Sequence, residues 1–452
     1  MHPSLSDSLD RPRPLARVVG LGFGVAIAIG GTIGIGILRL PAAVAQAIPH
    51  PIGIIAVWAF GGAYALAGSL QVVELGTMLP FEGGWYFYAR RAFGDYAGFI
   101  VGLGFWLSLV AALAQIAVSI GDYSALLWPS LSTSTTVIAI ATLMVFTAIS
   151  LCGLHSASIV QNIMAAVEGF ALIIFVALCF SHPVHQSVLP HITTNAHGPS
   201  LMVLVSGVVV ALQAVINTYD GWYAPFFFLE EDRAPTSNLP RSMLLGTLSI
   251  VAIYLLVNLA LLHVLPVPML AHSTLPAADA GAAVFGRRSG TVITAISLLI
   301  LLSAVNAILL MCSRVIFAMA RDGLLLHWAS RTDRRGTPST ALCVTAAAAL
   351  LLIASGTFDQ LLIWSASLAV FAYLSGYLAV FVFRQRHPEW RRPTRAWGYP
   401  WTTGFAILVS TCFLMGLVVQ DPHSSFWIAT VLALSYPIYR VLHRKTGAIS
   451  EL

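Results

Sequence analysis

Residues 26–41 read AIAIGGTIGIGILRLP, an apolar stretch in which four glycines fall within seven positions. Glycine destabilises a helix interior by about 1 kcal/mol relative to alanine, so this spacing predicts an unwound stretch inside an otherwise helical span. Irregular backbone at membrane depth persists only where it is buried in protein or lines a cavity. There, free N–H groups and the N-terminus of the following half-helix can hold an anion such as a carboxylate. We therefore expect a broken transmembrane helix with a binding site at the break.

A second interruption follows further along the chain, in residues 208–231, VVVALQAVINTYDGWYAPFFFLEE. The polar group NTYDG, residues 217–221, lies inside an apolar run, and Pro225 comes soon after. A carboxylate such as Asp220 is costly inside a span and usually faces a cavity. A glycine-rich span can also reflect close helix packing alone. Two interruptions at corresponding places in two halves favour an inverted-repeat transporter with a site near the membrane midplane.

The composition agrees with an all-α integral membrane protein. Of the 452 residues, 58% are hydrophobic and 9% are charged, and the mean hydropathy is +0.86. Soluble domains carry about 25% charged residues. The net charge of +5 comes from short basic clusters between apolar runs, which excludes the basic stripe that nucleic-acid binding requires. The five cysteines form no CxxC pair, so we expect no zinc site, no disulfide framework, no other metal and no cofactor.

Twelve segments are apolar enough to cross the membrane, for which a helix needs about 20 residues. The predicted spans are 18–46, 52–79, 95–121, 135–153, 157–181, 200–229, 241–265, 290–320, 339–356, 359–383, 401–419 and 425–440. Residues 1–17 and 441–452 are predicted to be tails on either side of a single transporter domain, 18–440.

The arginines predict the orientation. They cluster in the N-terminal tail, in alternate connections and in the C-terminal tail, whereas the other set of connections holds only Arg287 and Arg288. Cytoplasmic loops of membrane proteins carry the excess of Lys and Arg. We therefore expect a multi-pass protein of the cell membrane with both termini in the cytoplasm.

Short motifs along nearly the whole chain resemble those of the amino acid–polyamine–organocation permeases. They are GIGI (34–37), ELGTM (74–78), YDGW (219–222), ARDG (320–323) and WGYP (397–400). The resemblance implies an amino acid permease of the five-plus-five inverted-repeat fold, with the first and sixth helices unwound at mid-membrane. The repeats would be residues 18–181 and 200–383, with two additional helices in 401–440.

The resemblance also implies a substrate site. The substrate carboxylate would meet backbone N–H groups near Ile33, Gly34, Ile35 and Gly36, and its ammonium group would meet carbonyls near Tyr219 and Asp220. Trp222 would shape or gate the pocket. The expected binding residues are thus Thr32, Ile33, Gly34, Ile35, Gly36, Asn217, Tyr219, Asp220, Gly221 and Trp222. Two positions depart from the family pattern: Ile35 replaces a small residue, and Asn217 stands where relatives often place a gating aromatic residue.

Three further polar residues lie in predicted spans. Glu168 lies in the middle of the fifth span, six residues after Asn162, where some relatives carry a lysine that stands in for a sodium ion. A carboxyl group in hydrocarbon favours its protonated form, so Glu168 is the candidate for a coupling proton or for pairing with a cationic substrate; a structural, hydrogen-bonded glutamic acid is the alternative. Asn306 is a pocket candidate by position. Arg39 either attracts an anionic substrate group or extends outward to the membrane surface, and we favour the second interpretation.

The sequence favours a secondary transporter of amino acids that works by alternating access, with proton coupling or exchange against a counter-substrate. A polyamine or cationic amino acid antiporter is the alternative, because two carboxylates lie at membrane depth. An intramembrane enzyme is disfavoured because the chain has no HExxH and no GxSxG motif. A channel is disfavoured because nothing in the sequence resembles a selectivity filter. The expected partners are the substrate, a coupling proton or counter-substrate, and the lipid bilayer.

Overall fold

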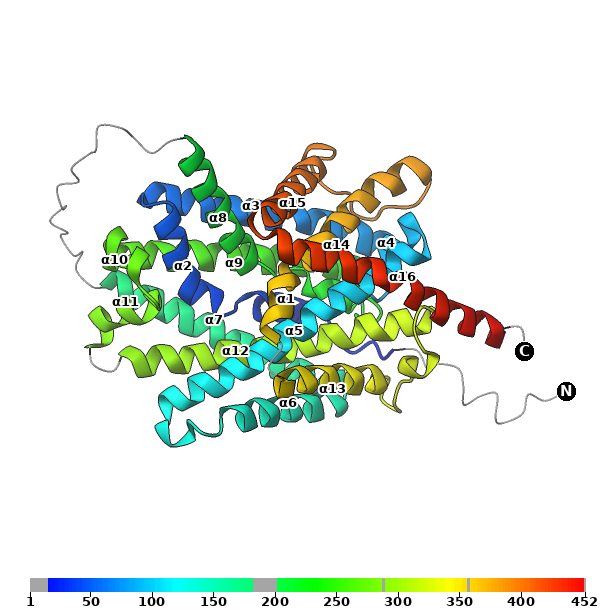
Figure 1. Ribbon diagram of the computed structural model, residues 1–452, viewed down its shortest axis with the longest axis horizontal. Helices are drawn as coiled ribbons and strands as arrows, with labels where there is room; N and C mark the ends of the chain where they lie inside the picture. Colours follow the sequence, from blue (N-terminus) through cyan, green and yellow to red (C-terminus); the bar gives the residue numbers. More distant parts are fainter. Residues whose placement is uncertain (1–14, 182–200, 287–288, 356–357, 451–452) are drawn as a thin grey trace.

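The computed structural model describes residues 15–181, 201–286, 289–355 and 358–450, and within these ranges the regular elements are helices. In chain order they are α1 (Leu21–Thr32), α2 (Gly36–Ala47), α3 (Pro51–Met78), α4 (Trp85–Phe93), α5 (Asp95–Leu127), η1 (Pro129–Leu131), α6 (Thr135–Leu151), α7 (Leu154–Ser181), α8 (Leu201–Thr218), η2 (Ala224–Phe227), α9 (Pro235–Val264), α10 (Val267–His272), α11 (Pro276–Phe285), α12 (Ser289–Arg321), η4 (His327–Ser330), α13 (Ser339–Ser355), α14 (Phe358–Arg386), α15 (Trp401–Gln420) and α16 (Pro422–Ser450). The long helices run roughly along one direction of the molecule (Figure 1).

The helices coincide with the segments expected to cross the membrane. In the described part of the chain, seven helices are long and apolar enough to do so by themselves: α3, α5, α7, α9, α12, α14 and α15. The pair α1 and α2 qualifies as one bent span, with an angle of 48° between its halves. The four remaining predicted spans contain shorter apolar helices, so the number twelve stays a prediction.

The two interrupted segments occupy the middle of the bundle. Helix α1 packs against α7, α9 and α12, and it contacts η2, the short helix after the second interruption. Helix α5 packs against both α12 and α14, and α12 also contacts η2. The surroundings of the two interruptions are therefore built by helices from several distant parts of the sequence.

A short backbone bridge joins the entrance of α1 to the segment after η2. The N–H groups of Val18 and Val19 both donate to the Glu231 carbonyl oxygen, at 3.0 and 3.2 Å. The Arg233 N–H group donates to the Val19 carbonyl oxygen at 3.1 Å, which closes an isolated bridge between Val19 and Asp232. The inner halves of both interrupted segments are thus fixed to each other.

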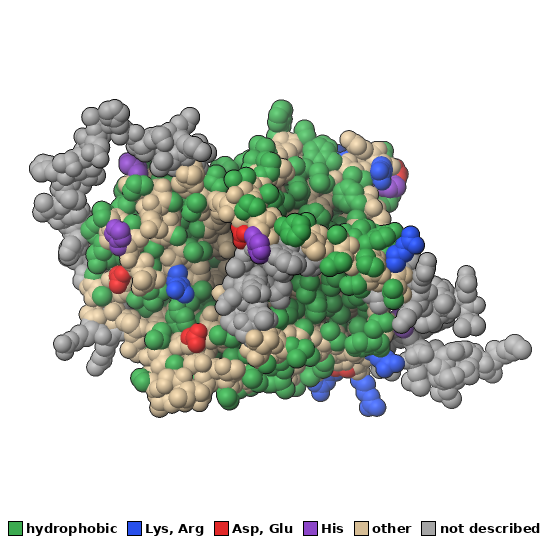
Figure 2. Space-filling view, viewed as in Figure 1, with side chains coloured by type: hydrophobic (Ala, Val, Ile, Leu, Met, Phe, Trp, Pro, Cys, Tyr) green, Lys and Arg blue, Asp and Glu red, His purple; other side chains and the backbone are tan. Residues whose placement is uncertain are grey.

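The surface is that of a lipid-facing protein. Hydrophobic side chains cover most of the face in Figure 2, and Lys and Arg side chains gather mainly at the end where α16 finishes. Large apolar side chains are exposed along the outer helices; Phe170 on α7 is 66% exposed and Val419 on α15 is 80% exposed. We call the end at which the chain enters α1 and leaves α16 the terminal end. The opposite end, which carries α10 and α11, is the far end (Figure 1).

Some sequence-based predictions concern residues outside the described ranges. Residues 1–14 of the N-terminal tail lie there. Arg287 and Arg288, the two arginines in the connections predicted to face away from the cytoplasm, lie there as well.

Candidate functional site

The first break separates α1 from α2. Helix α1 ends at Thr32, and Ile33 leaves the helical conformation with φ −70° and ψ 102°. Helix α2 begins at Gly36. A carbon atom placed on Gly34 would meet only the Thr32 carbonyl oxygen, at 3.9 Å, so there is free space beside this glycine. The first N–H groups of α2 have no acceptor within their own helix, and they can therefore bind an anion in that space.

The second break follows α8, which ends at Thr218. Gly221 has φ +109°, which favours glycine, and an added Cβ would overlap the Gly31 carbonyl oxygen of the first break. Gly31 in turn has Ala224 and Gly221 as its nearest neighbours. The two breaks therefore touch each other through glycine backbone, and only glycine allows the approach at position 221.

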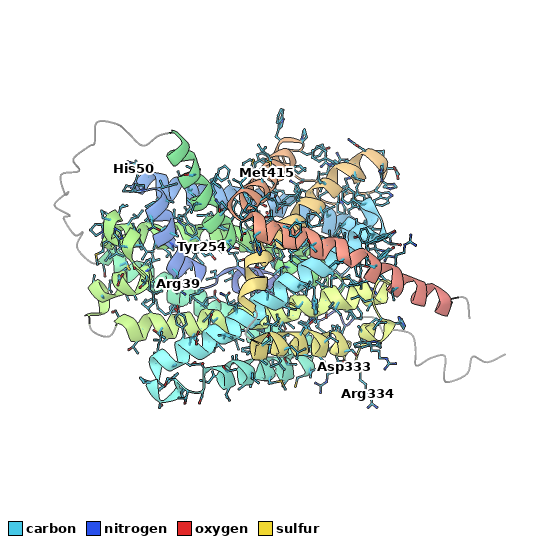
Figure 3. All side chains as sticks on the ribbon, viewed as in Figure 1. Arg39, His50, Tyr254, Asp333, Arg334 and Met415 are labelled. Carbon is cyan, nitrogen blue, oxygen red and sulfur yellow. The ribbon has the colours of Figure 1, made fainter. Side chains whose placement is uncertain are left out.

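Tyr254 on α9 connects the two breaks. Its hydroxyl oxygen lies 2.9 Å from the Thr32 carbonyl oxygen and 3.0 Å from the Thr218 carbonyl oxygen. The side chain is fully buried, and Figure 3 shows it near the middle of the molecule, away from Asp333 and Arg334 at the terminal end. Sequence reasoning missed Tyr254, because a tyrosine within an apolar span carries no pattern that separates it from a packing residue.

A small cavity lies beside the breaks. Its volume is about 50 Å³, and helices α5, α12 and α14 complete its wall. Its lining includes Gly31, Ser108, Asn217, Asp220, Gly221, Met311 and Ser365. Asn217 is exposed, and Asp220 is partly exposed and accepts a hydrogen bond from the Tyr373 hydroxyl group. The cavity thus combines a carboxylate and an amide with mostly small neighbours.

The structure brings together only part of the expected binding set. Gly221, Asn217 and Asp220 line the cavity, and Gly34, Ile35 and Gly36 lie at the break between α1 and α2. Thr32 and Ile33 are buried at the same break, and the Thr32 hydroxyl group donates to the Ala28 carbonyl oxygen.

The remaining expected residues point elsewhere. Tyr219 is 1% exposed, and its hydroxyl group donates to the Trp58 carbonyl oxygen, outside the cavity lining. Trp222 is buried in an aromatic cluster with Trp85, Tyr223, Phe226 and Tyr373. Arg39 on α2 is exposed, toward the far end relative to Asp333 (Figure 3).

Asn306 belongs to a polar network behind α1. Its amide group donates to the Gln161 side-chain oxygen at 2.7 Å, and Gln161 donates to Ser303 at 3.2 Å. A Cβ on Gly30 would overlap the Gln161 amide and the Ser303 hydroxyl group. Gly30, the first glycine of the motif, is therefore explained by the approach of α7 and α12 to α1, and Asn306 contacts this region through Gln161.

Glu168 lies on the buried side of α7. Its side chain is 0% exposed, and neither carboxyl oxygen has a hydrogen-bond partner in the described part of the chain. The opposite side of the same helix, with Ile163, Phe170 and Ile173, is exposed. The structure therefore buries a carboxyl group in the middle of α7, close to Ser303 of the Gln161 network.

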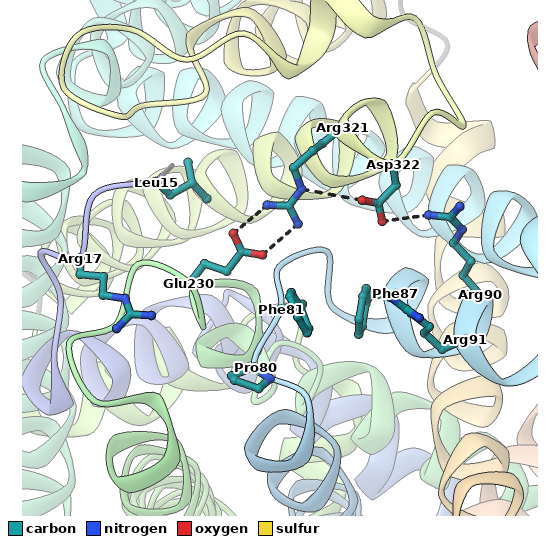
Figure 4. Close-up of a pocket in the computed structure, with 10 residues that line it drawn as sticks. All are labelled: Leu15, Arg17, Pro80, Phe81, Phe87, Arg90, Arg91, Glu230, Arg321 and Asp322. Atoms are coloured by element: carbon teal, nitrogen blue, oxygen red, sulfur yellow. Dashed lines mark hydrogen bonds and ion pairs between the residues drawn. The ribbon is translucent and has the colours of Figure 1, made fainter. Parts of the chain in front are cut away.

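Ion pairs close the terminal end. Arg314 on α12 binds the Glu231 carboxylate through two nitrogens at 2.9 and 3.0 Å, and both side chains are 1% exposed. Arg321 binds Glu230 in the same two-fold manner at 2.7 and 2.8 Å. Asp322 accepts from Arg90 at 3.1 Å (Figure 4). We call these six residues the ion-pair cluster. A pocket of about 550 Å³ opens beside it, lined also by Arg17, Phe81 and Arg91.

A second buried carboxylate at this end is also paired. Glu74, 2% exposed near the end of α3, accepts from Arg384 of α14 at 2.9 and 2.6 Å and from the Ala396 N–H group at 2.6 Å. Arg384 also lies over the Tyr399 ring, 3.8 Å from its centroid. Helices α3 and α14 and the segment before α15 are held together by these contacts.

Comparison with known proteins gives one family and several relatives. The family model described as amino acid permease matches residues 24–439. The serine/threonine exchanger SteT of Bacillus subtilis is 27% identical over 446 residues, which cover 96% of this chain and 98% of that protein. The mouse b(0,+)-type amino acid transporter 1 is 26% identical, over 95% of this chain and 88% of its own. The mouse Asc-type amino acid transporter 1 is also 26% identical, over 84% of this chain and 73% of its own.

Proposed function

We infer that this chain, which belongs to the amino acid permease family, is a multi-pass membrane transporter that exchanges small neutral amino acids by alternating access. The observation that carries the proposal is the contact between the two breaks at Gly31 and Gly221, beside a cavity that contains Asp220. A zwitterion offers one group to each side of such a site. Its carboxylate would meet the N–H groups at the start of α2, and its ammonium group would meet carbonyl oxygens after α8.

The size of the cavity supports a small substrate. Its wall is formed by residues such as Gly31, Ser108 and Ala112, and its volume is about 50 Å³. Hydroxyl and amide groups on Ser108 and Asn217 add polarity without charge. The full-length similarity to a serine/threonine exchanger agrees with this size and supports exchange as the mode of transport.

The arrangement corresponds to an outward-facing conformation. Asn217 in the cavity and Arg39 beyond it are exposed, whereas the ion-pair cluster and the aromatic cluster close the terminal end. Because arginines mark the cytoplasmic side, we assign the terminal end to the cytoplasm and the far end to the outside of the cell membrane. The ion-pair cluster and the aromatic cluster then form an inner gate.

Glu168 supports a role for protons. Burial disfavours the ionised form of a carboxyl group, so the buried position of Glu168 favours a bound proton. Its helix packs against α1, and the Gln161 network lies on the same helix. We propose that Glu168 is the site at which a coupling proton binds.

Exchange in liposomes tests the proposal. Purified protein is reconstituted with unlabelled serine inside, and the entry of labelled serine is measured. We expect entry that requires internal amino acid and that alanine, serine or threonine outside inhibits, whereas spermidine does not. Inhibition by spermidine alone would instead establish the polyamine antiporter, for which Asp220 supplies the carboxylate. Glu168→Gln, compared with Glu389→Gln at the surface, is expected to remove the dependence of entry on external pH.

A further inference from the structure

Glu82 is a buried carboxyl group that the transport mechanism above does not use. It lies in the loop 79–84, between the end of α3 and the start of α4, and therefore outside the membrane-spanning helices. Its side chain is 0% exposed, although a loop at the end of a bundle normally exposes its acidic residues. Neither carboxyl oxygen has a hydrogen-bond partner among the residues that the structure describes.

Two glycines allow this loop to pack closely against η2 and α12. Gly83 and Gly84 have φ values of +108° and +56°, and an added Cβ on Gly84 would overlap the Phe227 ring. On Gly83 it would lie 2.9 Å from Ala318 of α12. The Glu82 N–H group donates to the Glu230 side chain at 3.1 Å. The backbone geometry therefore directs this side chain inward, toward η2 and α12.

The surroundings of Glu82 hold more carboxyl groups than guanidinium groups. Glu230 and Glu231 approach it from the segment after η2, and Arg314 approaches from α12. Arg314 is already bound by both oxygens of Glu231, and Arg321 by both oxygens of Glu230. Each guanidinium group thus has its own carboxylate. Glu82 is a third carboxyl group near the same two arginines, and it forms no ion pair with either of them in the described part of the chain.

A proton resolves this imbalance. The Glu82 carboxyl group lies near that of Glu231. Two ionised carboxylates there would repel each other, whereas a protonated Glu82 can donate a hydrogen bond to Glu231. Burial, and next the charge of Glu231, raise the pKa of Glu82 well above its ordinary value against the opposing effect of Arg314. Both effects favour the neutral form of Glu82 in the closed inner gate.

We propose that Glu82 is a proton-binding site of the inner gate, loaded from the cytoplasm when the gate closes and emptied into the cytoplasm when it opens. Trp85, three residues after Glu82, packs against Tyr223, which lines the Asp220 cavity, and Glu82 itself is not part of that lining, so the proposed proton path does not use the outer side. The pocket beside Glu230 and Arg321 provides the cytoplasmic approach (Figure 4). This proton differs from a coupling proton on Glu168, because it returns to the side from which it came.

Proton binding to Glu82 is thermodynamically linked to closure of the inner gate. The closed gate binds one more proton than the open gate, in which water reaches Glu82 and restores its ordinary acidity. A low cytoplasmic pH therefore favours the closed, outward-facing form, and a rise in pH favours opening, by at most about tenfold in the equilibrium constant per pH unit for one proton. The fraction of protein with an open inner gate thus depends on the cytoplasmic pH.

The test uses right-side-out membrane vesicles, in which the lumen is the cytoplasmic side. Vesicles contain serine and a buffer of pH 5.5, 6.5, 7.5 or 8.5, the outside is held at one pH, and the initial entry of labelled serine is measured. This inference depends on the proposed function, so wild-type vesicles must first show entry. No entry at any pH refutes the proposed function as well as the inference. For the wild type we expect entry to rise several-fold between internal pH 5.5 and 7.5.

Two variants test whether Glu82 is the group that makes entry depend on internal pH. Glu82→Gln mimics the protonated state, and we expect slow entry that no longer depends on internal pH. Glu389→Gln removes an exposed carboxylate at the same end, whose side chain is 65% exposed, and is expected to behave as the wild type. If Glu82→Gln does not reach the membrane, Glu82→Asp, which keeps a titrating carboxyl group, is compared with Glu82→Asn.

Either of two results overturns the inference while leaving amino acid exchange intact. One is wild-type entry that is independent of internal pH. The other is a neutral variant at position 82 that keeps the wild-type dependence on internal pH.

Discussion

The hydroxyl group of Tyr254 lies within hydrogen-bond distance of two carbonyl oxygens, one from each break. These oxygens, on Thr32 and Thr218, are the last acceptors of α1 and α8, and the ends of broken helices leave such carbonyl groups unsatisfied. A single side chain from α9 therefore fixes the relative position of both halves of the proposed substrate site. At the scale of one residue, this is the strongest constraint on that site.

Replacement of Tyr254 by phenylalanine removes the donor and leaves the ring in place. A buried acceptor without a donor costs about 1–3 kcal/mol, and part of this free energy is lost from the ordered site. We expect KM for the amino acid to rise about tenfold, which corresponds to 1.4 kcal/mol. Tyr96→Phe is the control, because Tyr96 donates to the Leu432 carbonyl oxygen near α16. Equal KM values for the two variants would show that Tyr254 does not position the site.

Glu82 gives the fold a specific dependence on pH. Its pKa is raised in the folded protein, so the folded state holds a proton that the unfolded chain releases above a pH of about 4.3. This contribution to stability is complete below that pH and is lost as the pH rises toward the raised value, at no more than about 1.4 kcal/mol per unit. The Glu82→Gln variant lacks this pH-dependent contribution to stability.

Thermal unfolding of the purified protein between pH 5 and 8 measures this effect. We expect the unfolding temperature of the wild type to fall relative to that of Glu82→Gln as the pH increases. Parallel curves for the two proteins would mean that Glu82 has the same pKa in the folded and unfolded states.

At the scale of elements, the sequence predicted a break inside the first span. Glycine spacing placed the first break within residues 30–36, and the structure has it at 33–35, between α1 and α2. The length of the apolar runs placed the long helices, because their apolar residues face lipid as well as the core. The motif NTYDG identified Asn217 and Asp220 of the cavity wall.

The rest of the site depends on contacts that one sequence does not reveal. Ser108 and Met311 reach the cavity from α5 and α12, and Tyr373 reaches Asp220 from α14. These residues are at least 90 positions away from the motif to which they contribute, and their own surroundings in the sequence are ordinary apolar spans. Asn306 was predicted for the pocket from its position in the span alone. Its side chain donates a hydrogen bond to Gln161.

The contact between the two breaks can be tested at Gly221. Alanine there combines a positive φ with an overlap against the Gly31 carbonyl oxygen. Such conformations cost a non-glycine residue about 1–2 kcal/mol before any overlap is counted. We expect exchange to be abolished while the protein still reaches the membrane. Gly404→Ala on α15, where an added Cβ meets nothing within 4 Å, is expected to retain wild-type exchange. Normal exchange by Gly221→Ala would rule out the close approach.

At the scale of the whole molecule, two neighbouring carboxylates secure the terminal end in different environments. The Glu231–Arg314 pair is 1% exposed on both sides, whereas Glu230 and Arg321 are 22% and 25% exposed. Loss of one partner from a buried pair costs about 3–5 kcal/mol, because the other charge stays buried alone. A partly exposed pair contributes about 0–1 kcal/mol. The first pair is thus a condition of folding, and the second is a closure that transport can break.

Matched variants separate these roles. We expect Glu231→Gln to lower the yield and the unfolding temperature of the purified protein strongly. Glu230→Gln is expected to leave the unfolding temperature nearly unchanged and to shift the protein toward the form that is open to the cytoplasm. A thiol reagent of low molecular mass, applied from that side to a cysteine introduced at Leu229, which is 2% exposed, measures the shift. Equal unfolding temperatures for the two variants would contradict the distinction.

The backbone bridge between Val19 and Asp232 has a consequence for how tightly the carrier holds a gradient. Three hydrogen bonds fasten the segment before α1 to the segment after η2, so neither inner half-helix can swing away alone. We therefore expect the two halves to move together as one body that pivots where the glycines meet. Half-open intermediates, through which a solute could pass without being exchanged, are then expected to be rare. A cell that concentrates an amino acid with this protein would lose little of it to leakage.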